Sequence, residues 1–122
     1  MAVKQREVYM LPHPINPQSQ ENHPFIVLSV ESSNSKENTF IAVMVTSSPH
    51  TVDDHSFLLS NDMFEKDLKK SSCHARMHLM MLCLTEETKG FPPVNKMKDL
   101  YFKQLMKSIG DYIFDYEFNP NK

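Results

Sequence analysis

Glycine is scarce in this sequence, with 2 residues in 122, and tryptophan is absent. Glycine-rich loops hold phosphates in nucleotide-binding folds, and a G-x-S-x-G turn carries the nucleophile of many hydrolases. Neither motif is present, and C-x-x-C and H-E-x-x-H zinc motifs are missing as well. These absences argue against a nucleotide-binding fold, a serine hydrolase and a motif-bearing zinc enzyme.

Long apolar runs and a disulfide framework are also missing. The longest nearly unbroken apolar run, Leu79–Leu84, is far shorter than the roughly 20 residues that span a membrane. No signal-peptide stretch follows Met1. The two cysteines, Cys73 and Cys83, would lie roughly 33 Å apart on one extended strand, too far for a disulfide. We expect a cytoplasmic protein with no membrane segment, and one domain over residues 1–122.

An excess of basic residues is lacking too, since 13 Lys and Arg face 15 Asp and Glu for a net charge of −2. This balance excludes a protein that coats nucleic acid through its overall charge. The charge is nevertheless uneven: residues 31–65 hold one lysine against six acids, whereas residues 66–78 hold four basic residues against one acid. The basic strip predicts a local polyanion-binding surface that includes Lys70, Arg76, His74 and His78.

Apolar alternation with a period of two predicts a mainly β fold over residues of about 5–84. The connecting segments are polar or rich in proline. Pro12–Asn22 is predicted as a loop, Glu31–Asn38 as a turn, and Asn61–Lys70 as one or two helical turns capped by Asn61 or Asp62. The predicted strands are Arg6–Leu11, Phe25–Val30, Thr39–Thr46, His55–Ser60 and Cys73–Leu84.

The last predicted strand and the segment after it complete the architecture. In Cys73–Leu84 the odd positions are all apolar, which predicts one continuous core face, and the even positions begin His74, Arg76, His78, which predicts a basic edge. After Pro92-Pro93, apolar residues spaced by three and four predict a helix over about 94–117, which Gly110 could shorten. Strands followed by a helix favour a small antiparallel barrel with the helix packed on it.

Candidate chemistry lies where two predicted strands meet. His23 precedes the strand Phe25–Val30, and Thr46-Ser47-Ser48 ends the strand Thr39–Thr46. Antiparallel pairing makes His23 and Thr46 neighbours. A histidine that relays protons and hydroxyls that stabilise charge on phosphorus suit phosphodiester cleavage. The alternative is a loop histidine beside a threonine that only ends a strand.

A metal site is not expected. His74-x3-His78 would share a ligand-bearing face in a helix, but in the predicted strand the two residues lie roughly 13 Å apart. His50-x4-His55 has no ordered partner. Surface histidines are the simpler interpretation, and we expect no metal and no cofactor.

Two stretches resemble the signatures of the MazF/PemK family of toxin endoribonucleases. A first strand Glu7–Met10, a proline-rich loop and His23-Pro24 opening an apolar strand that ends Leu28-Ser29 resemble the first signature, in which Arg-Pro opens the strand. Val43–Ser48 resembles the second, an apolar strand ending in Thr-Ser. The resemblance implies an SH3-like antiparallel barrel (MazF/PemK/CcdB-like) and a homodimer. It also implies the toxin of a type II toxin-antitoxin system, bound by a cognate antitoxin. Its activity would be metal-independent cleavage of single-stranded RNA through 2′-hydroxyl attack to a cyclic phosphate.

Carried over residue by residue, the resemblance places the family's catalytic Arg at His23 and its Thr at Thr46, with Ser47 next. His23 relays protons better than an arginine but clamps phosphate less well. Arg76, with His74, His78 and Lys70, is expected to supply the missing positive charge by binding RNA. Two alternatives stay open: a similar barrel that no longer cleaves and binds RNA or a protein, and an unrelated small β-barrel.

Overall fold

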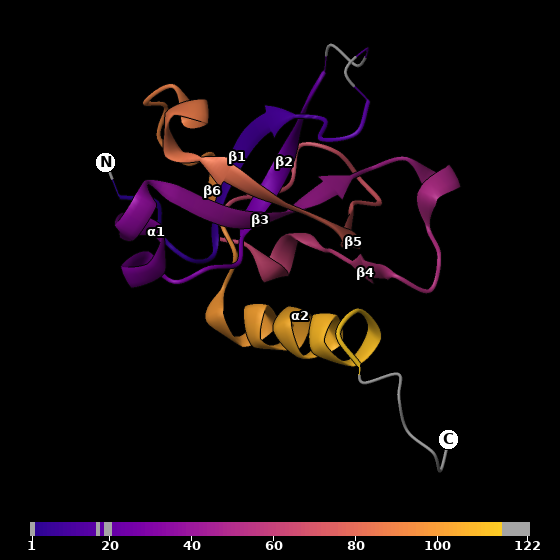
Figure 1. Cartoon of the computed structure of the whole chain (residues 1–122). Helices are drawn as coiled ribbons and strands as arrows, with labels where there is room; N and C mark the ends of the chain where they lie inside the picture. The colour runs from indigo at the N-terminus through magenta and orange to yellow at the C-terminus, as the bar shows by residue number, and fades with distance from the viewer. Residues whose placement is uncertain (1, 17, 19–20, 116–122) are drawn as a thin grey trace.

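The computed structural model (Figure 1) describes residues 2–16, 18 and 21–115. Within them, six strands form one antiparallel half-barrel sheet in the order β4-β5-β3-β2-β1-β6, and the predicted mainly β class with a C-terminal helix is confirmed. The strands are β1 (Glu7–Pro12), β2 (Asn22–Val27), β3 (Thr39–Thr46), β4 (Ser56–Leu58), β5 (His74–Leu84) and β6 (Asn95–Lys96). The helices are α1 (Glu31–Glu37) and α2 (Asp99–Tyr112), with single 3-10 turns η1 (Pro49–Thr51), η2 (Asn61–Met63) and η3 (Thr85–Thr88).

Both faces of the central strands are buried, as the nearly continuous apolar sequences of β2 and β3 require. On one face, which α2 covers in Figure 1, Phe102, Leu105 and Ile109 pack against a first apolar cluster that includes Ile26 and Val45. On the other face lies a second cluster made of Val3, Tyr9, Leu11, Phe25, Val27, Phe40, Ala42, Met44 and Cys83. The central strands are therefore held from two sides.

The predicted single core face of Cys73–Leu84 is wrong. Val43 pairs with Met80 and Val45 pairs with Ala75, so two steps along β3 face five steps along β5. The three additional residues in β5 reverse which face its side chains point to. Hence Ala75 lies in the first apolar cluster and Cys83, at an odd position too, lies in the second.

The segment predicted as a turn at Glu31–Asn38 forms α1, and the reason is a buried asparagine. The side-chain amide of Asn34 donates to the carbonyls of Val3 at 2.9 Å and Ser29 at 3.1 Å, and its oxygen accepts from the Ser29 hydroxyl at 2.5 Å. That hydroxyl oxygen also accepts the Ile41 amide at 2.8 Å. Asn34 thus ties the N-terminal segment, α1 and β3 together.

The C-terminal helix is confirmed, with different bounds. The segment before it pairs with β1 as β6, so α2 begins later than predicted, and it continues through Gly110. Phe102 faces the core, whereas Leu100 is 64% exposed. The predicted helical turns in Asn61–Lys70 reduce to η2, whose N-cap is Ser60. The predicted helix end beyond residue 115, with Tyr116, lies outside the described residues, as do parts of the loop Pro12–Asn22.

Neither cysteine is in a disulfide, and both Cys73 and Cys83 are buried. Among the described residues, no helix has the length and apolar character that a membrane crossing requires.

Replacing Asn34 by alanine tests whether this residue holds α1. Asn34→Ala leaves the Val3 and Ser29 carbonyls without their donor, and we expect a loss of about 2 kcal/mol in the free energy of unfolding. Urea denaturation followed by circular dichroism measures it. Ser35→Ala, on the exposed side of the same helix, is the matched control, and equal losses in both variants would contradict the role given to Asn34.

Candidate active site

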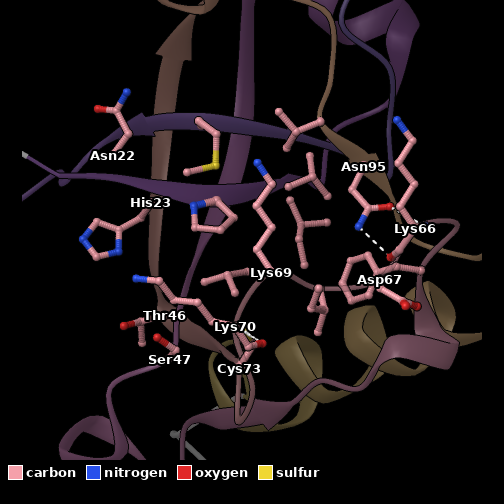
Figure 2. A pocket seen from close by; sticks show the side chains of 18 of the residues that line it. Asn22, His23, Thr46, Ser47, Lys66, Asp67, Lys69, Lys70, Cys73 and Asn95 are labelled. Atoms are coloured by element: carbon pink, nitrogen blue, oxygen red, sulfur yellow. Dashed lines mark hydrogen bonds between the residues drawn. The ribbon is translucent and has the colours of Figure 1, made fainter.

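A cavity of about 410 Å³ opens where β2 begins and β3 ends. Its floor is apolar and belongs to the first cluster, with Val8, Ile26 and Val45 from three adjacent strands. Its rim is polar, and Figure 2 shows the rim side chains on opposite sides of the opening. The labelled rim residues are Asn22, His23, Thr46, Ser47, Lys66, Asp67, Lys69, Lys70 and Asn95.

The pairing of β2 with β3 sets the distance between the two candidate signatures. The strands are antiparallel, with Phe25 opposite Met44, so the same register carried two residues further brings His23 opposite Thr46. Both residues line the cavity, together with Ser47 (Figure 2). The predicted antiparallel pairing of these two strands is confirmed.

Thr46 is held so that its hydroxyl hydrogen is available. Only 8% of the residue is exposed, and its Oγ1 accepts a hydrogen bond from the Ser48 amide at 3.3 Å. Because the oxygen accepts there, the hydroxyl hydrogen can be donated to a ligand in the cavity. Thr46 is thereby suited to bind an oxyanion.

His74 is hydrogen-bonded to the turn that follows β3. Its predicted place on a basic edge is wrong. The residue is fully buried, at 0% exposed. Its Nε2 lies 2.9 Å from Thr51 Oγ1, whose own hydrogen is donated to the Ser48 carbonyl at 3.0 Å. Since that oxygen must then accept from the ring, Nε2 carries the hydrogen. Its pairing opposite Thr46 and its bond to Thr51, both distant in the sequence, account for the burial that alternation did not predict.

His23 has the electrostatic setting of a neutral imidazole. Burial is the largest influence and lowers the pKa of His23. The His13 ring, whose centroid is 5.4 Å away, lowers the pKa further, Glu21 opposes this, and Lys70 adds a smaller lowering effect. At neutral pH the ring of His23 is therefore available as a proton acceptor.

The lysines of the rim come from the segment between η2 and β5, which Asn95 holds over the cavity. Asn95 accepts the Lys66 amide at 3.0 Å and donates to the Lys66 carbonyl at 2.9 Å (dashed in Figure 2). At the other end of the segment, the Cys73 thiol donates to the Lys70 carbonyl at 3.1 Å. Burial raises the pKa of Cys73, so this thiol stays protonated and serves as a donor.

Sequence reasoning included Lys70 but missed Lys69 and Asn95. The charge count of residues 66–78 pointed to the lysines as a group. Asn95 carried no comparable signal, because its importance comes from a contact 29 residues away.

Arg76 and His78 form a separate cluster next to β4, and neither lines the cavity. Arg76 Nη2 lies 3.2 Å from His78 Nε2, and the His78 ring centroid is 5.8 Å from that of His55. Burial, followed by the charge of Arg76, lowers the pKa of His78. The His55 amide, donating to Asp53 at 2.8 Å, is the main cause of a lowered pKa for that carboxyl. The structure thus divides the predicted basic strip between two places.

A metal-ligand constellation is not found in the part of the chain that the structure describes, since no three His, Cys, Asp or Glu side chains there form a group that could hold an ion.

The fold is that of the MazF endoribonuclease toxins. A mycobacterial endoribonuclease superposes with a TM-score of 0.67 at 10% identity, over 91% of this chain and 90% of its own. MazF from Deinococcus radiodurans gives 0.67 at 13% identity, over 94% and 99%. A mycobacterial endoribonuclease in complex with its cognate antitoxin gives 0.65 at 9% identity, over 90% and 91%. No protein-family model and no curated protein sequence matches this chain.

Replacing Asn95 by alanine tests how the lysine segment is held. Asn95→Ala removes both bonds to the Lys66 backbone, and we expect a loss of about 1 kcal/mol in unfolding free energy together with faster hydrogen exchange at the Lys66 amide. Asn95→Asp is the control, because it keeps the acceptor for that amide and should protect it better than alanine does. Unchanged exchange in Asn95→Ala would mean that other contacts hold the segment.

Proposed function

We propose that this chain is the toxin of a type II toxin-antitoxin system and cleaves single-stranded RNA in the cytoplasm without a metal ion. The observation that carries the proposal is one cavity, in a MazF-like fold, lined by an imidazole, three hydroxyl side chains and three lysines (Figure 2). These groups supply proton transfer and anion stabilisation, which are the two needs of phosphodiester cleavage.

In the proposed reaction the 2′-hydroxyl of the substrate attacks the adjacent phosphorus. The imidazole of His23 accepts the proton of this hydroxyl while the 2′-O–P bond forms and the P–O5′ bond breaks. The products are a 2′,3′-cyclic phosphate and a 5′-hydroxyl. The leaving 5′-oxygen takes its proton from solvent, and His23 releases to solvent the proton that it accepted. A neutral ring is needed at the start, in agreement with the lowered pKa of His23.

Charge on the phosphate is balanced by residues of the rim. Thr46 and Ser47 would donate hydrogen bonds to the nonbridging oxygens, which carry more charge in the transition state than in the substrate. Lys69 and Lys70 would supply the positive charge that His23 lacks in its neutral form. An arginine would supply both functions from one side chain, because its guanidinium combines a permanent charge with two parallel hydrogen-bond donors.

Outside the cavity, Arg76 and His78 would contact a phosphate further along the RNA chain. Similar solved structures include a mycobacterial endoribonuclease with its cognate antitoxin and a MazE–MazF complex from Deinococcus radiodurans. We propose that this chain likewise binds a cognate antitoxin and forms a homodimer. Exposed side chains at the end of α2, Tyr112 and Phe114 among them, offer apolar surface for such contacts.

A second function, RNA binding without cleavage, is favoured by one observation. The rim also includes the carboxylates of Glu21 and Asp67, which weaken its attraction for phosphate, and it contains no arginine. A site of this kind could hold RNA weakly through its lysines and still fail to stabilise the transition state.

Cleavage of a mixed-sequence single-stranded RNA in EDTA separates the two functions. We expect His23→Ala to lower the rate at least about 100-fold by removing the general base. Thr46→Val keeps the side-chain shape but removes the hydroxyl, and should cost about as much. His50→Ala and Thr39→Val, which change residues outside the cavity, are the matched controls. Full activity in both site variants would reject the site, and salt-sensitive binding by an uncleaving wild type would favour the second function.

The pH profile tests the state of His23. Since its pKa is lowered, the rate should rise with pH through a value below the ordinary 6.5 of histidine and be level at pH 7. Glu21→Gln removes a charge that raises this pKa and should move the acidic limb to lower pH. His13→Phe keeps a ring but removes a charge that lowers it, and should move the limb to higher pH. Shifts of the same sign in both variants would contradict His23 as the titrating base.

A further inference from the structure

A second cavity, of about 420 Å³, lies directly beside the first. The two share three lining residues, Met10, Asn22 and Val94, so a chain leaving the first cavity past Asn22 enters the second. None of the candidate catalytic side chains lines it. The remaining lining residues are Tyr9, Thr88, Phe91, Pro92 and Pro93.

The second cavity differs from the first in chemistry. No residue that lines it is charged, and most of its side chains are aromatic, proline or aliphatic. The amide of Asn22 offers one donor and one acceptor at the boundary between the cavities. A flat apolar ligand with a polar edge fits such walls, whereas a phosphate would find no cation there.

Phe91 is the exposed aromatic side chain of this cavity. The residue is 66% exposed, although a phenylalanine gains free energy from burial. Its backbone is nonetheless fixed: its amide donates to the Thr88 carbonyl at 3.0 Å, and the Val94 amide donates to the Val8 carbonyl at 2.8 Å. Pro92 and Pro93 lie between these two hydrogen-bonded residues, and their rings restrict the backbone further. A ring presented by a rigid segment loses little freedom on binding.

We propose that this second cavity binds a nucleobase of single-stranded RNA next to the phosphate held in the first, with the base stacked on Phe91. The inference rests on the proposed function and extends it by assigning a base site. Aromatic side chains bind unpaired bases by stacking, and an amide can hydrogen-bond a base edge. The shared wall at Met10 and Asn22 lets one nucleotide place its phosphate over the lysines and its base beside Phe91.

A tryptophan reporter tests the base site, because the chain contains no tryptophan of its own. Phe91→Trp places the reporter in the cavity. Phe114→Trp is the matched control, since Phe114 is 68% exposed and lines neither cavity. The probes are four single-stranded deoxyhexamers, each of one base, which lack the attacking 2′-hydroxyl, and a hexamer of abasic deoxyribose phosphates with the same backbone charge. Fluorescence anisotropy of labelled copies reports binding independently.

We expect at least one base-bearing hexamer to quench the fluorescence of Phe91→Trp, the abasic hexamer to leave it unchanged, and Phe114→Trp to respond to neither. Quenching by the abasic hexamer to the same extent would overturn the base site. Binding by anisotropy without any response of Phe91→Trp would do so as well, because the hexamer would then be bound elsewhere.

Cleavage kinetics distinguish failure of the base site from failure of the proposed function. Loss of one stacked base should lower kcat/KM of Phe91→Ala about 5- to 150-fold, mainly through KM, because the groups at the phosphate are untouched. Wild-type cleavage with an unaltered Phe91→Ala would reject the base site alone. An uncleaving wild type that also binds no hexamer would reject the base site and the proposed function together.

Discussion

The register of β3 between β2 and β5 is the constraint on which the site depends. On one side it brings His23 beside Thr46 at the edge of the sheet. On the other it pairs Thr46 with His74, whose buried ring supports the turn after β3. A slip of one residue would exchange the faces of β3 and put each of its side chains into the wrong apolar cluster. The same apolar residues that give the sheet its stability therefore also align the groups proposed to bind the phosphate.

The elements that local pattern predicted correctly are those whose sequence signal is local. Continuous apolar runs predicted β3 with its observed bounds and β2 three residues too late at both ends, as Phe25–Val30 instead of Asn22–Val27. Their antiparallel pairing followed from the short connection. Elsewhere the structure depends on contacts between residues far apart in the sequence, which the local pattern could not predict. α1 depends on Asn34 bonding to Val3, 31 residues away, and the lysine segment depends on Asn95. His74 was misplaced because its burial comes from its pairing with Thr46 and its bond to Thr51, which alternation within a single strand does not show.

Histidine in place of arginine separates two tasks that a guanidinium performs together. A neutral imidazole accepts a proton but attracts no phosphate, so the charge has to come from another element. In the proposed site it comes from the lysine segment, which the Asn95 side chain holds beside the cavity through two hydrogen bonds to the Lys66 backbone (Figure 2). The basic excess that the whole chain lacks is thus supplied locally, where the field of a few lysines acts at short range.

The scarcity of glycine is matched by residues with side chains that occupy left-handed backbone positions in the turns of the fold. Among the described residues, four with side chains adopt a positive φ, which glycine would adopt without strain: Arg6, Asn38, Ser72 and Lys89. Each such residue costs about 1 kcal/mol or more, so surrounding contacts must hold it. Arg6, directly before β1, is the clearest case. Its amide bonds to Val27, its carbonyl accepts from Met97, and its guanidinium returns to the Met97 carbonyl at 3.1 Å. Arg6 therefore keeps its positive φ. Its side chain, which makes that conformation strained, also joins β1 to the segment leading into α2.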